Sequence, residues 1–355
     1  MRSRMGWIVA AGAVAATALV GLYPLPADAH GGRTVFTQEN LVSDQPGVGK
    51  LTDPNLVNAW GMSHGPNTPV WVSDNGADVA TLYRTDTPGS PVTAVPLVVS
   101  IPGGAPTGQA FNDTTSFTVP GTGKPALFMF IGEDGDLSVW NQMAGMSAVN
   151  VGHTPDAVYK GLALDHSPFG PLLLATNFHD NRIDVFDAGF TRLPVDKLFR
   201  DPFLPRGYAP FNVAEIGKQI FVTYAKQDAD REDDVAGPGH GFVDVYTNYG
   251  VLEHRFASRG VLNSPWGMVI APESFGAFAG DLLIGNFGDG RIHAFNPHSG
   301  RLVGTLSTAK HKPIVIDGLW GLIVGDQVAG GSESVWFSAG PDEESHGLLG
   351  LLHAG

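Results

Sequence analysis

No cysteine occurs in the 355 residues, so neither a disulfide nor a lipid attached to cysteine can stabilise or anchor this protein. Small secreted domains commonly depend on disulfides. This chain is instead long enough to bury a sizeable hydrophobic core. Helical periodicity is also scarce, because no amphipathic run with a period near 3.6 residues extends beyond a turn or two. The two absences favour a large all-β domain.

Positive charge is the next shortage. Lysine and arginine together number 21 against 35 aspartates and glutamates, which gives a formal net charge of −14 at pH 7. A surface of this sign repels the phosphates of nucleic acids and anionic lipids. We therefore expect no nucleic acid and no membrane surface as a partner. The charge favours cations and neutral or cationic ligands, and the expected partner is a small molecule, a glycan or a protein.

The first 29 residues have the pattern of a secretory signal peptide. Arg2 and Arg4 are basic, residues 5–25 form an apolar run, and residues 27–29 (Ala-Asp-Ala) form a small-x-small cleavage site. An uncleaved membrane anchor is the alternative, because the run approaches the length that spans a bilayer. The cleavage site and the Gly and Pro content favour cleavage. We therefore expect a secreted, extracellular monomer that consists of residues 30–355.

A short phrase returns six times along the chain, at intervals of 49 to 55 residues. Each phrase precedes an apolar strand, and a second strand follows that ends in an aromatic residue in five of the six units. A unit of this length cannot bury both of its faces alone, so copies stack until a ring closes. The sequence predicts an all-β, six-bladed β-propeller that occupies residues 30–355 as a single domain. The phrases are Trp60-Gly61, Phe111-Asn112, Lys160-Gly161, Phe211-Asn212, Trp266-Gly267 and Trp320-Gly321.

Each unit is expected to contain four strands, of which the last lies at the outer edge of the blade. The sixth unit lacks room for a fourth strand after residues 348–352, whereas residues 34–42 are strand-like and otherwise unassigned. We predict that this N-terminal segment completes the last blade, closes the ring and removes two exposed edges. The outer strands of the other blades are predicted at residues 94–101, 148–152, 193–199, 252–257 and 302–307.

One face of the predicted propeller is acidic. The turns between units and the turns that join second to third strands share this face, and every turn of the second kind contains a carboxylate. Gly after Asp or Asn is ordinary turn chemistry, and single surface histidines are common, which is the structural alternative. The surplus of carboxylates nevertheless indicates a binding face. Its candidate ligand-binding residues are Asn177, His179 and Asn286.

The inner strands are expected to line a central channel. Asn112 and Asn212 stand where other phrases have Gly, and Asn58, Asn263 and Asp317 lie just before other phrases. Amide and carboxylate oxygens are ligands for hard cations such as Ca²⁺. We predict that Asn112, Asn212 and Asp317 hold Ca²⁺ or another divalent cation, and that all five residues line a ligand site. The alternative is that the amides bond to neighbouring backbone groups or water.

Several longer phrases resemble an uncharacterised bacterial family of secreted propellers; they are residues 51–61, 159–163, 209–212, 262–267 and 285–290. Some members of that family carry a PEP-CTERM sorting tail, which this chain lacks. The architecture is more remotely similar to NHL-repeat proteins and to the senescence marker protein/gluconolactonase group. In that group a divalent cation lies in a six-bladed channel on Asn, Asp and Glu side chains. The resemblance implies that Asn112 and Asn212 match the Asn ligands, whereas Asn58 stands where that group has a Glu.

Two functions remain open at this stage. The first is a secreted binding or scaffold protein that uses its acidic face and central channel. The alternative is a metal-dependent hydrolase or lyase, similar to lactonases, in which the channel cation polarises a carbonyl group or activates water. Asp317 would then act as a ligand or a general base. No further catalytic residue is indicated by the sequence.

Overall fold

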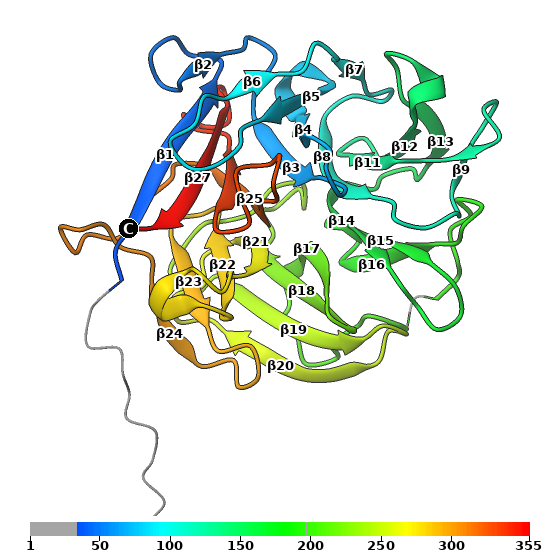
Figure 1. The fold of residues 1–355 in the computed structure, drawn as a ribbon. Coiled ribbons are helices and arrows are strands. Elements are labelled where there is room, and N and C mark those ends of the chain that lie inside the picture. Colours follow the sequence, from blue (N-terminus) through cyan, green and yellow to red (C-terminus); the bar gives the residue numbers. More distant parts are fainter. Residues whose placement is uncertain (1–33, 196) are drawn as a thin grey trace, which may run out of the picture. The chain divides into compact units, whose positions relative to one another are not determined.

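The computed structural model describes residues 34–195 and 197–355. They form an all-β unit of six small sheets arranged as the blades of a propeller (Figure 1). The six-bladed fold predicted from the repeated phrase is confirmed. The predicted signal peptide at residues 1–29 lies outside the described residues. No helix in the described part of the chain is long and apolar enough to cross a membrane.

The blades follow one another in sequence order, each with its first strand at the centre of the ring. Blade one contains β3 (Ala59–Ser63), β4 (Val70–Asp74) and β5 (Val79–Arg84), with β6 (Thr93–Ala94) and β7 (Val99–Ser100) at its edge. Blade two contains β8 (Pro106–Phe111), β11 (Phe128–Gly132), β12 (Asp136–Trp140) and β13 (Val149–His153); β9 (Thr118–Val119) and β10 (Lys124–Pro125) form a separate hairpin. Blade three contains β14 (Tyr159–Asp165), β15 (Leu172–Asn177) and β16 (Arg182–Phe186).

The remaining blades have at least four strands each. Blade four contains β17 (Tyr208–Ile216), β18 (Gln219–Lys226), β19 (Gly241–Thr247) and β20 (Leu252–Ser258). Blade five contains β21 (Pro265–Ile270), β22 (Leu282–Asn286), β23 (Ile292–Phe295) and β24 (Leu302–Thr305). Blade six contains β25 (Leu319–Val324), β26 (Val335–Ala339), β27 (Leu348–Ala354), β1 (Phe36–Ser43) and β2 (Leu51–Thr52). Three short 3₁₀ helices are η1 (Asn75–Ala77), η2 (Gln142–Ala144) and η3 (Gly276–Phe278).

The N-terminal strand closes the ring, as predicted. β1 pairs antiparallel with β27, from Phe36 opposite Ala354 to Ser43 opposite Leu348. In Figure 1 the blue strand and the red strand lie side by side. Phe36 is buried in a core cluster that also contains Leu283 of blade five and Phe337 of blade six. The first and last strands therefore belong to one sheet. β1 covers the edge of β27, and the outer edge of β1 pairs with β2 at Val42 and Ser43.

A β-bulge recurs at the same place in every inner strand and explains the repeated phrase. In blade one the pairing register shifts between Ala59 and Met62, so Trp60 and Gly61 occupy the bulge. A Cβ atom on Gly61 would lie 2.3 Å from the carbonyl oxygen of Thr107 in the neighbouring blade. Because a side chain has no room there, glycine is needed where two inner strands approach each other.

Blade two does not follow the predicted phrase. Its register shift lies between Pro106 and Gln109, so its bulge is formed by Thr107 and Gly108. A Cβ atom on Gly108 would lie 2.4 Å from the backbone nitrogen of Leu162, the same kind of close approach as at Gly61. The prediction that Phe111-Asn112 is the second phrase was therefore wrong by four residues. The spacing favoured Phe111-Asn112 over Thr107-Gly108, because the later pair gives more even intervals between the phrases.

Among the described residues of the segment 193–199, blade three has no outer strand, contrary to the prediction. At the edge of β16 an isolated bridge joins Phe186 to Arg192, and the Leu193 amide donates to the Val185 carbonyl oxygen at 2.8 Å. Pro194 has no backbone N–H to donate to the sheet and interrupts a ladder at this point. The other four predicted outer segments contain strands, with shorter or shifted boundaries.

Candidate functional site

Large aromatic rings close one end of the central channel. The first residue of each bulge lies at the start of an inner strand, and three of the six are tryptophans. The rings of Trp60 and Trp320 stack with centroids 3.7 Å apart, and Phe287 stacks on Trp320 at 3.9 Å. Trp266 meets Trp320 edge to face at 5.9 Å. The six residues at this position are Trp60, Thr107, Lys160, Phe211, Trp266 and Trp320.

Lys160 is the one charged residue at this position and lies inside the structure, with 2% of its side chain exposed. Its Nζ lies 2.5 Å from Glu133 Oε1, 3.3 Å from Asp233 Oδ1 and 5.2 Å from the centre of the Trp60 ring. Burial disfavours the charged amine, but the carboxylates of Glu133 and Asp233 outweigh it and raise the pKa of Lys160. The amine is therefore held as a buried cation.

Asn58 and Asn75 extend the contact between Lys160 and Glu133 to neighbouring blades through hydrogen bonds. The Asn75 amide donates to Glu133 Oε2 at 3.0 Å, and the Asn58 amide donates to Asn75 Oδ1 at 3.0 Å and to Glu344 Oε2 at 2.7 Å. The indole N–H of Trp320 donates to Asn58 Oδ1 at 3.1 Å. The Lys160 network therefore joins residues of five blades. It consists of Lys160, Glu133, Asp233, Asn75, Asn58 and Glu344.

Three carboxylates surround the single amine of this network. Burial raises the pKa of Glu344 to about 7, and the nearby charges of Glu133 and Asp233 add to the rise. The hydrogen bond from Asn58 and the charge of Lys160 act in the opposite direction but do not cancel it. Glu344 therefore exchanges its proton near neutral pH. Glu133 and Asp233 remain partly open to solvent, with side-chain exposures of 28% and 76%.

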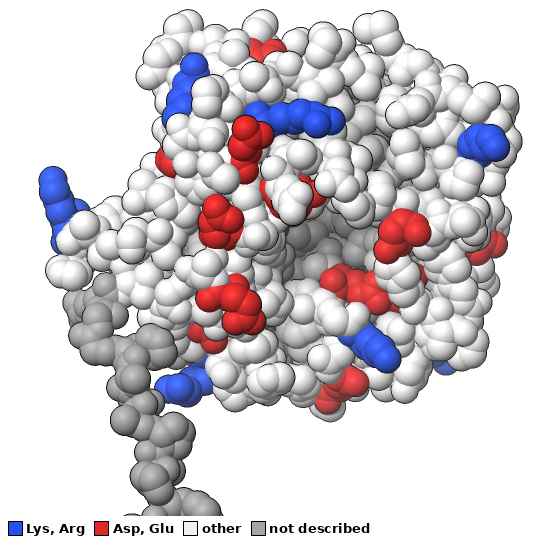
Figure 2. Space-filling model, viewed as in Figure 1, with Lys and Arg blue, Asp and Glu red and all other residues white. Residues whose placement is uncertain are grey.

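The central channel itself encloses a cavity of about 140 Å³. Most of its lining is glycine backbone and apolar side chains of the six inner strands, together with the amides of Gln109 and Asn212. Gln109 donates to the carbonyl oxygens of Gly61 at 2.7 Å and Trp71 at 2.8 Å. Figure 2 shows one face of the propeller, hollowed near its centre, with Asp and Glu side chains gathered around the hollow.

The three residues predicted to bind a metal do not come together. Asn212 lies in the channel, where its amide donates to the Trp266 carbonyl oxygen at 2.8 Å. Asn112 lies at the far end of β8, where its amide donates to the carbonyl oxygens of Ser116 and Ala126. Asp317 is exposed and accepts a hydrogen bond of 2.9 Å from the Asp342 amide. Each side chain serves its own loop or a neighbouring strand, which was the stated alternative.

No group of three or more His, Asp or Glu side chains suited to a metal ion occurs in the described ranges. The cation remains a prediction without an assembled set of ligands.

The other predicted site residues have local partners. Asn177 donates to Asp180 and Asp184, and His179 lies 3.1 Å from Asp180 Oδ1. Asn263 accepts a 2.6 Å hydrogen bond from the Gly237 amide, and Asn286 donates to the Val261 carbonyl oxygen and to Asp289. Of the eight predicted residues, only Asn58 belongs to the Lys160 network.

The sequence contained one usable signal for the residues that were missed. Lysine is out of place in a phrase otherwise led by aromatic residues, and this was visible at Lys160. Glu133, Asp233 and Glu344 stood in the turns recognised as acidic, but no pattern distinguished them from their acidic neighbours. Thr107 and Gln109 were hidden by the misplaced second phrase.

The chain belongs to the same family as two uncharacterised proteins of a mimivirus. It is 34% identical over 333 residues to the uncharacterised protein R648 of Acanthamoeba polyphaga mimivirus, covering 90% of this chain and 80% of that protein. It is also 34% identical to the uncharacterised protein L690 of the same virus, over 88% of this chain and 84% of the relative. These relatives are viral rather than bacterial, so they do not support the bacterial family. No family model matches the chain.

Solved structures show the same fold at low sequence identity. A protein of unknown function from Bacteroides thetaiotaomicron has a TM-score of 0.58 with 14% identity, over 91% of this chain and 76% of that chain. A streptogramin B lyase structure has a TM-score of 0.50 with 11% identity, over 91% and 98% of the two chains. These similarities support the six-bladed propeller and assign no function.

Proposed function

We propose that this protein is a secreted binding protein and that its ligand site is the Lys160 network at the end of the channel. The acids Glu133, Asp233 and Glu344 form the rim of the site. The stacked rings of Trp60 and Trp320 are buried, and the Trp60 ring lies against the Lys160 amine. The propeller supplies a rigid scaffold, because the inner strands that carry Lys160, Trp60 and Trp320 are fixed by pairing within each blade.

The observation that carries this proposal is the buried amine of Lys160. Burying a charged group costs several kcal/mol of folding free energy. A protein with an apolar residue at the same position is often at least as stable. Four other blades have an aromatic residue at this position, so stability alone does not require a lysine there. In addition, the indole N–H groups of Trp60 and Trp266 find no acceptor among the described residues. Such unpaired groups are expected at functional sites rather than in an optimised core.

The chemistry of the rim favours a ligand that donates hydrogen bonds. Two carboxylates remain in excess over the single amine, and they accept hydrogen bonds from hydroxyl or ammonium groups. Phe287 is partly exposed beside Trp320 and offers an apolar surface to a sugar or alkyl face. A hydroxyl-rich glycan or an amine is therefore the proposed ligand class.

The test is a glycan array together with a panel of amines, followed by titration of each hit with tryptophan fluorescence as the signal. The double variant Glu133→Gln with Glu344→Gln should weaken binding about tenfold or more, because charge-assisted hydrogen bonds become neutral ones. Glu273→Gln is the matched control, since Glu273 is exposed and makes no ion pair among the described residues. Equal affinity in the double variant and the control would show that the ligand binds elsewhere.

An enzyme is the second candidate, and Glu344 is the observation that favours it. A carboxyl group with a pKa of about 7 can act as a general acid or base at neutral pH. Screening lactones and esters tests this candidate. Turnover that disappears in Glu344→Gln and persists in Glu273→Gln would support an enzyme, whereas turnover unchanged in both variants would exclude this role for Glu344.

A further inference from the structure

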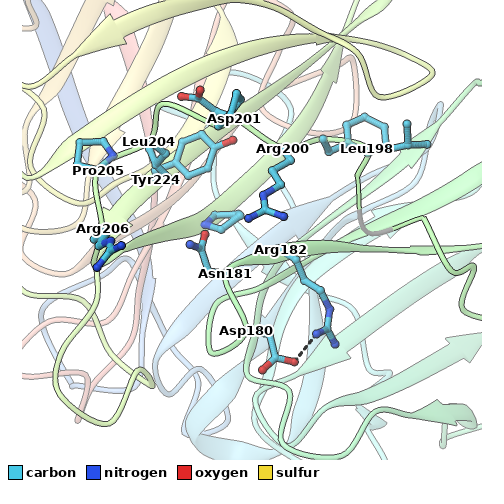
Figure 3. A pocket seen from close by; sticks show the side chains of 13 residues that line it. Asp180, Asn181, Arg182, Leu198, Arg200, Asp201, Leu204, Pro205, Arg206 and Tyr224 are labelled. Atoms are coloured by element: carbon cyan, nitrogen blue, oxygen red, sulfur yellow. Dashed lines mark ion pairs between the residues drawn. The ribbon is translucent and has the colours of Figure 1, made fainter.

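The cleft beside blade three differs in charge from the rest of the molecule. In the described part of the chain blade three has no outer strand, and residues between 198 and 206 border a cavity of about 610 Å³ beside blade four. Figure 3 shows the side chains that line it. Three of the 21 lysines and arginines of this anionic chain line this one cavity: Arg182, Arg200 and Arg206.

The carboxylates that line the cleft already have partners. Asp180 Oδ2 lies 2.7 Å from the Arg182 guanidinium, the ion pair drawn in Figure 3. Asp201 pairs with Arg255, which lies outside the lining, and also accepts a 2.7 Å hydrogen bond from the Phe203 amide. Arg200 and Arg206, by contrast, make no salt bridge within residues 34–195 and 197–355. As far as the described residues are concerned, the guanidinium groups of Arg200 and Arg206 have no carboxylate partner and can meet a ligand.

The segment that carries these arginines is anchored at both ends. Arg200 lies between two buried residues, Phe199 and Asp201, with exposures of 3% and 9%. The Phe199 amide donates to the Gly250 carbonyl oxygen at 2.8 Å, and at the other end the Gln227 amide donates to Gly207 at 2.9 Å. A fixed backbone reduces the entropy lost on binding, because fewer conformations have to be ordered.

We propose that this cleft binds a small molecule through an oxyanion group, a carboxylate, phosphate or sulfate, with Arg200 and Arg206 as its main partners. The planar fork of a guanidinium matches two oxygens of such a group. The walls contributed by Leu198, Leu204 and Pro205 accept the apolar part of the molecule. The site is separate from the Lys160 network and does not depend on the function proposed for it.

The test uses three probes, inorganic phosphate, sulfate and citrate, titrated into the full-length protein by calorimetry at an ionic strength held constant with NaCl. At least one probe should bind saturably to the wild-type protein. The double variant Arg200→Ala with Arg206→Ala should weaken that binding about tenfold or more. Both side chains are exposed, so the variant should keep the melting temperature of the wild-type protein.

The control is the double variant Arg84→Ala with Lys310→Ala, which removes two positive charges from exposed positions outside the cleft. It should bind the same probe as the wild-type protein does. Comparison of the three probes identifies which oxyanion is preferred. The proposal is overturned if no probe binds saturably below about 10 mM, or if the two double variants lose the same affinity, which would indicate a general charge effect.

Discussion

Phe36 and Ala354 lie opposite each other in the antiparallel pairing of β1 with β27. The centre of the Phe36 side-chain ring lies 4.9 Å from that of Phe275 and 5.5 Å from that of Phe278. The strand that closes the propeller therefore also fills the core next to blade five. The closure of the propeller therefore depends on side-chain packing as well as on backbone pairing.

Phe36→Ala is predicted to destabilise the protein by about 3–5 kcal/mol, the usual cost of truncating a buried phenylalanine. Thr37→Ala changes the neighbouring exposed residue and should stay within about 0.5 kcal/mol of the wild-type protein. Urea unfolding of the three proteins measures the difference. Equal unfolding midpoints for the two variants would show that β1 does not contribute to the stability of the ring.

The bulge of blade two provides a test of its corrected position. Gly108→Ala should cost about 3 kcal/mol, because the new Cβ atom would lie 2.4 Å from the Leu162 backbone nitrogen and overpack the wall of the channel. Gly152→Ala is the control within the same blade, since the nearest atom to its Cβ lies at 4.0 Å. Thermal unfolding distinguishes them. If Gly108→Ala unfolds at the temperature of Gly152→Ala, the close contact between blades two and three is absent.

Glu344 should make stability depend on pH in a defined window. Its pKa rises from 4.5 to about 7 on folding, so the folded state binds more protons than the unfolded state between these values. The contribution of Glu344 is therefore fully present below about pH 4.5 and is lost as the pH rises through about 7.

Glu344→Gln should reduce this loss, so that its free energy of unfolding falls less than that of the wild-type protein between pH 5 and pH 8. The slope is reduced rather than abolished, because burial also raises the pKa of Asp165 and of Asp244 to about 7. Urea unfolding at both pH values measures the change, with Glu273→Gln as the control. A wild-type slope in Glu344→Gln would mean that Glu344 is ionised throughout this range.

Secretion is the prediction that concerns the first 29 residues. When the whole chain is expressed in a bacterium with a general secretion pathway, the protein outside the cytoplasm should begin at His30. Ala29→Leu should block cleavage, because the peptidase that removes signal peptides requires a small residue at that position. Ala10→Leu lies in the apolar run and should be processed normally. Intact-mass measurement decides the outcome, and a product that retains Met1 in the wild-type protein contradicts the prediction.

The sequence was informative about the site only in part. Asn58 was selected because it precedes a phrase, and it does join the network through Asn75 and Glu344. Asn112 was selected by an alignment that the bulge in β8 corrects. Lys160 was part of a recognised phrase, yet its partner Asp233 lies 73 residues away and could not be identified.

The sequence by itself determined the number of blades and the closing strand. A recurring unit with apolar strands must stack on copies of itself, and the unit without a fourth strand needs one from elsewhere in the chain. Only the tertiary structure decided where the second bulge lies and which side chains meet at the end of the channel. The physical reason is that both depend on close approaches between segments of neighbouring blades, as between Asn58 and Glu344, which are 286 residues apart. The spacing of the repeated phrase along the sequence does not predict such contacts between distant residues.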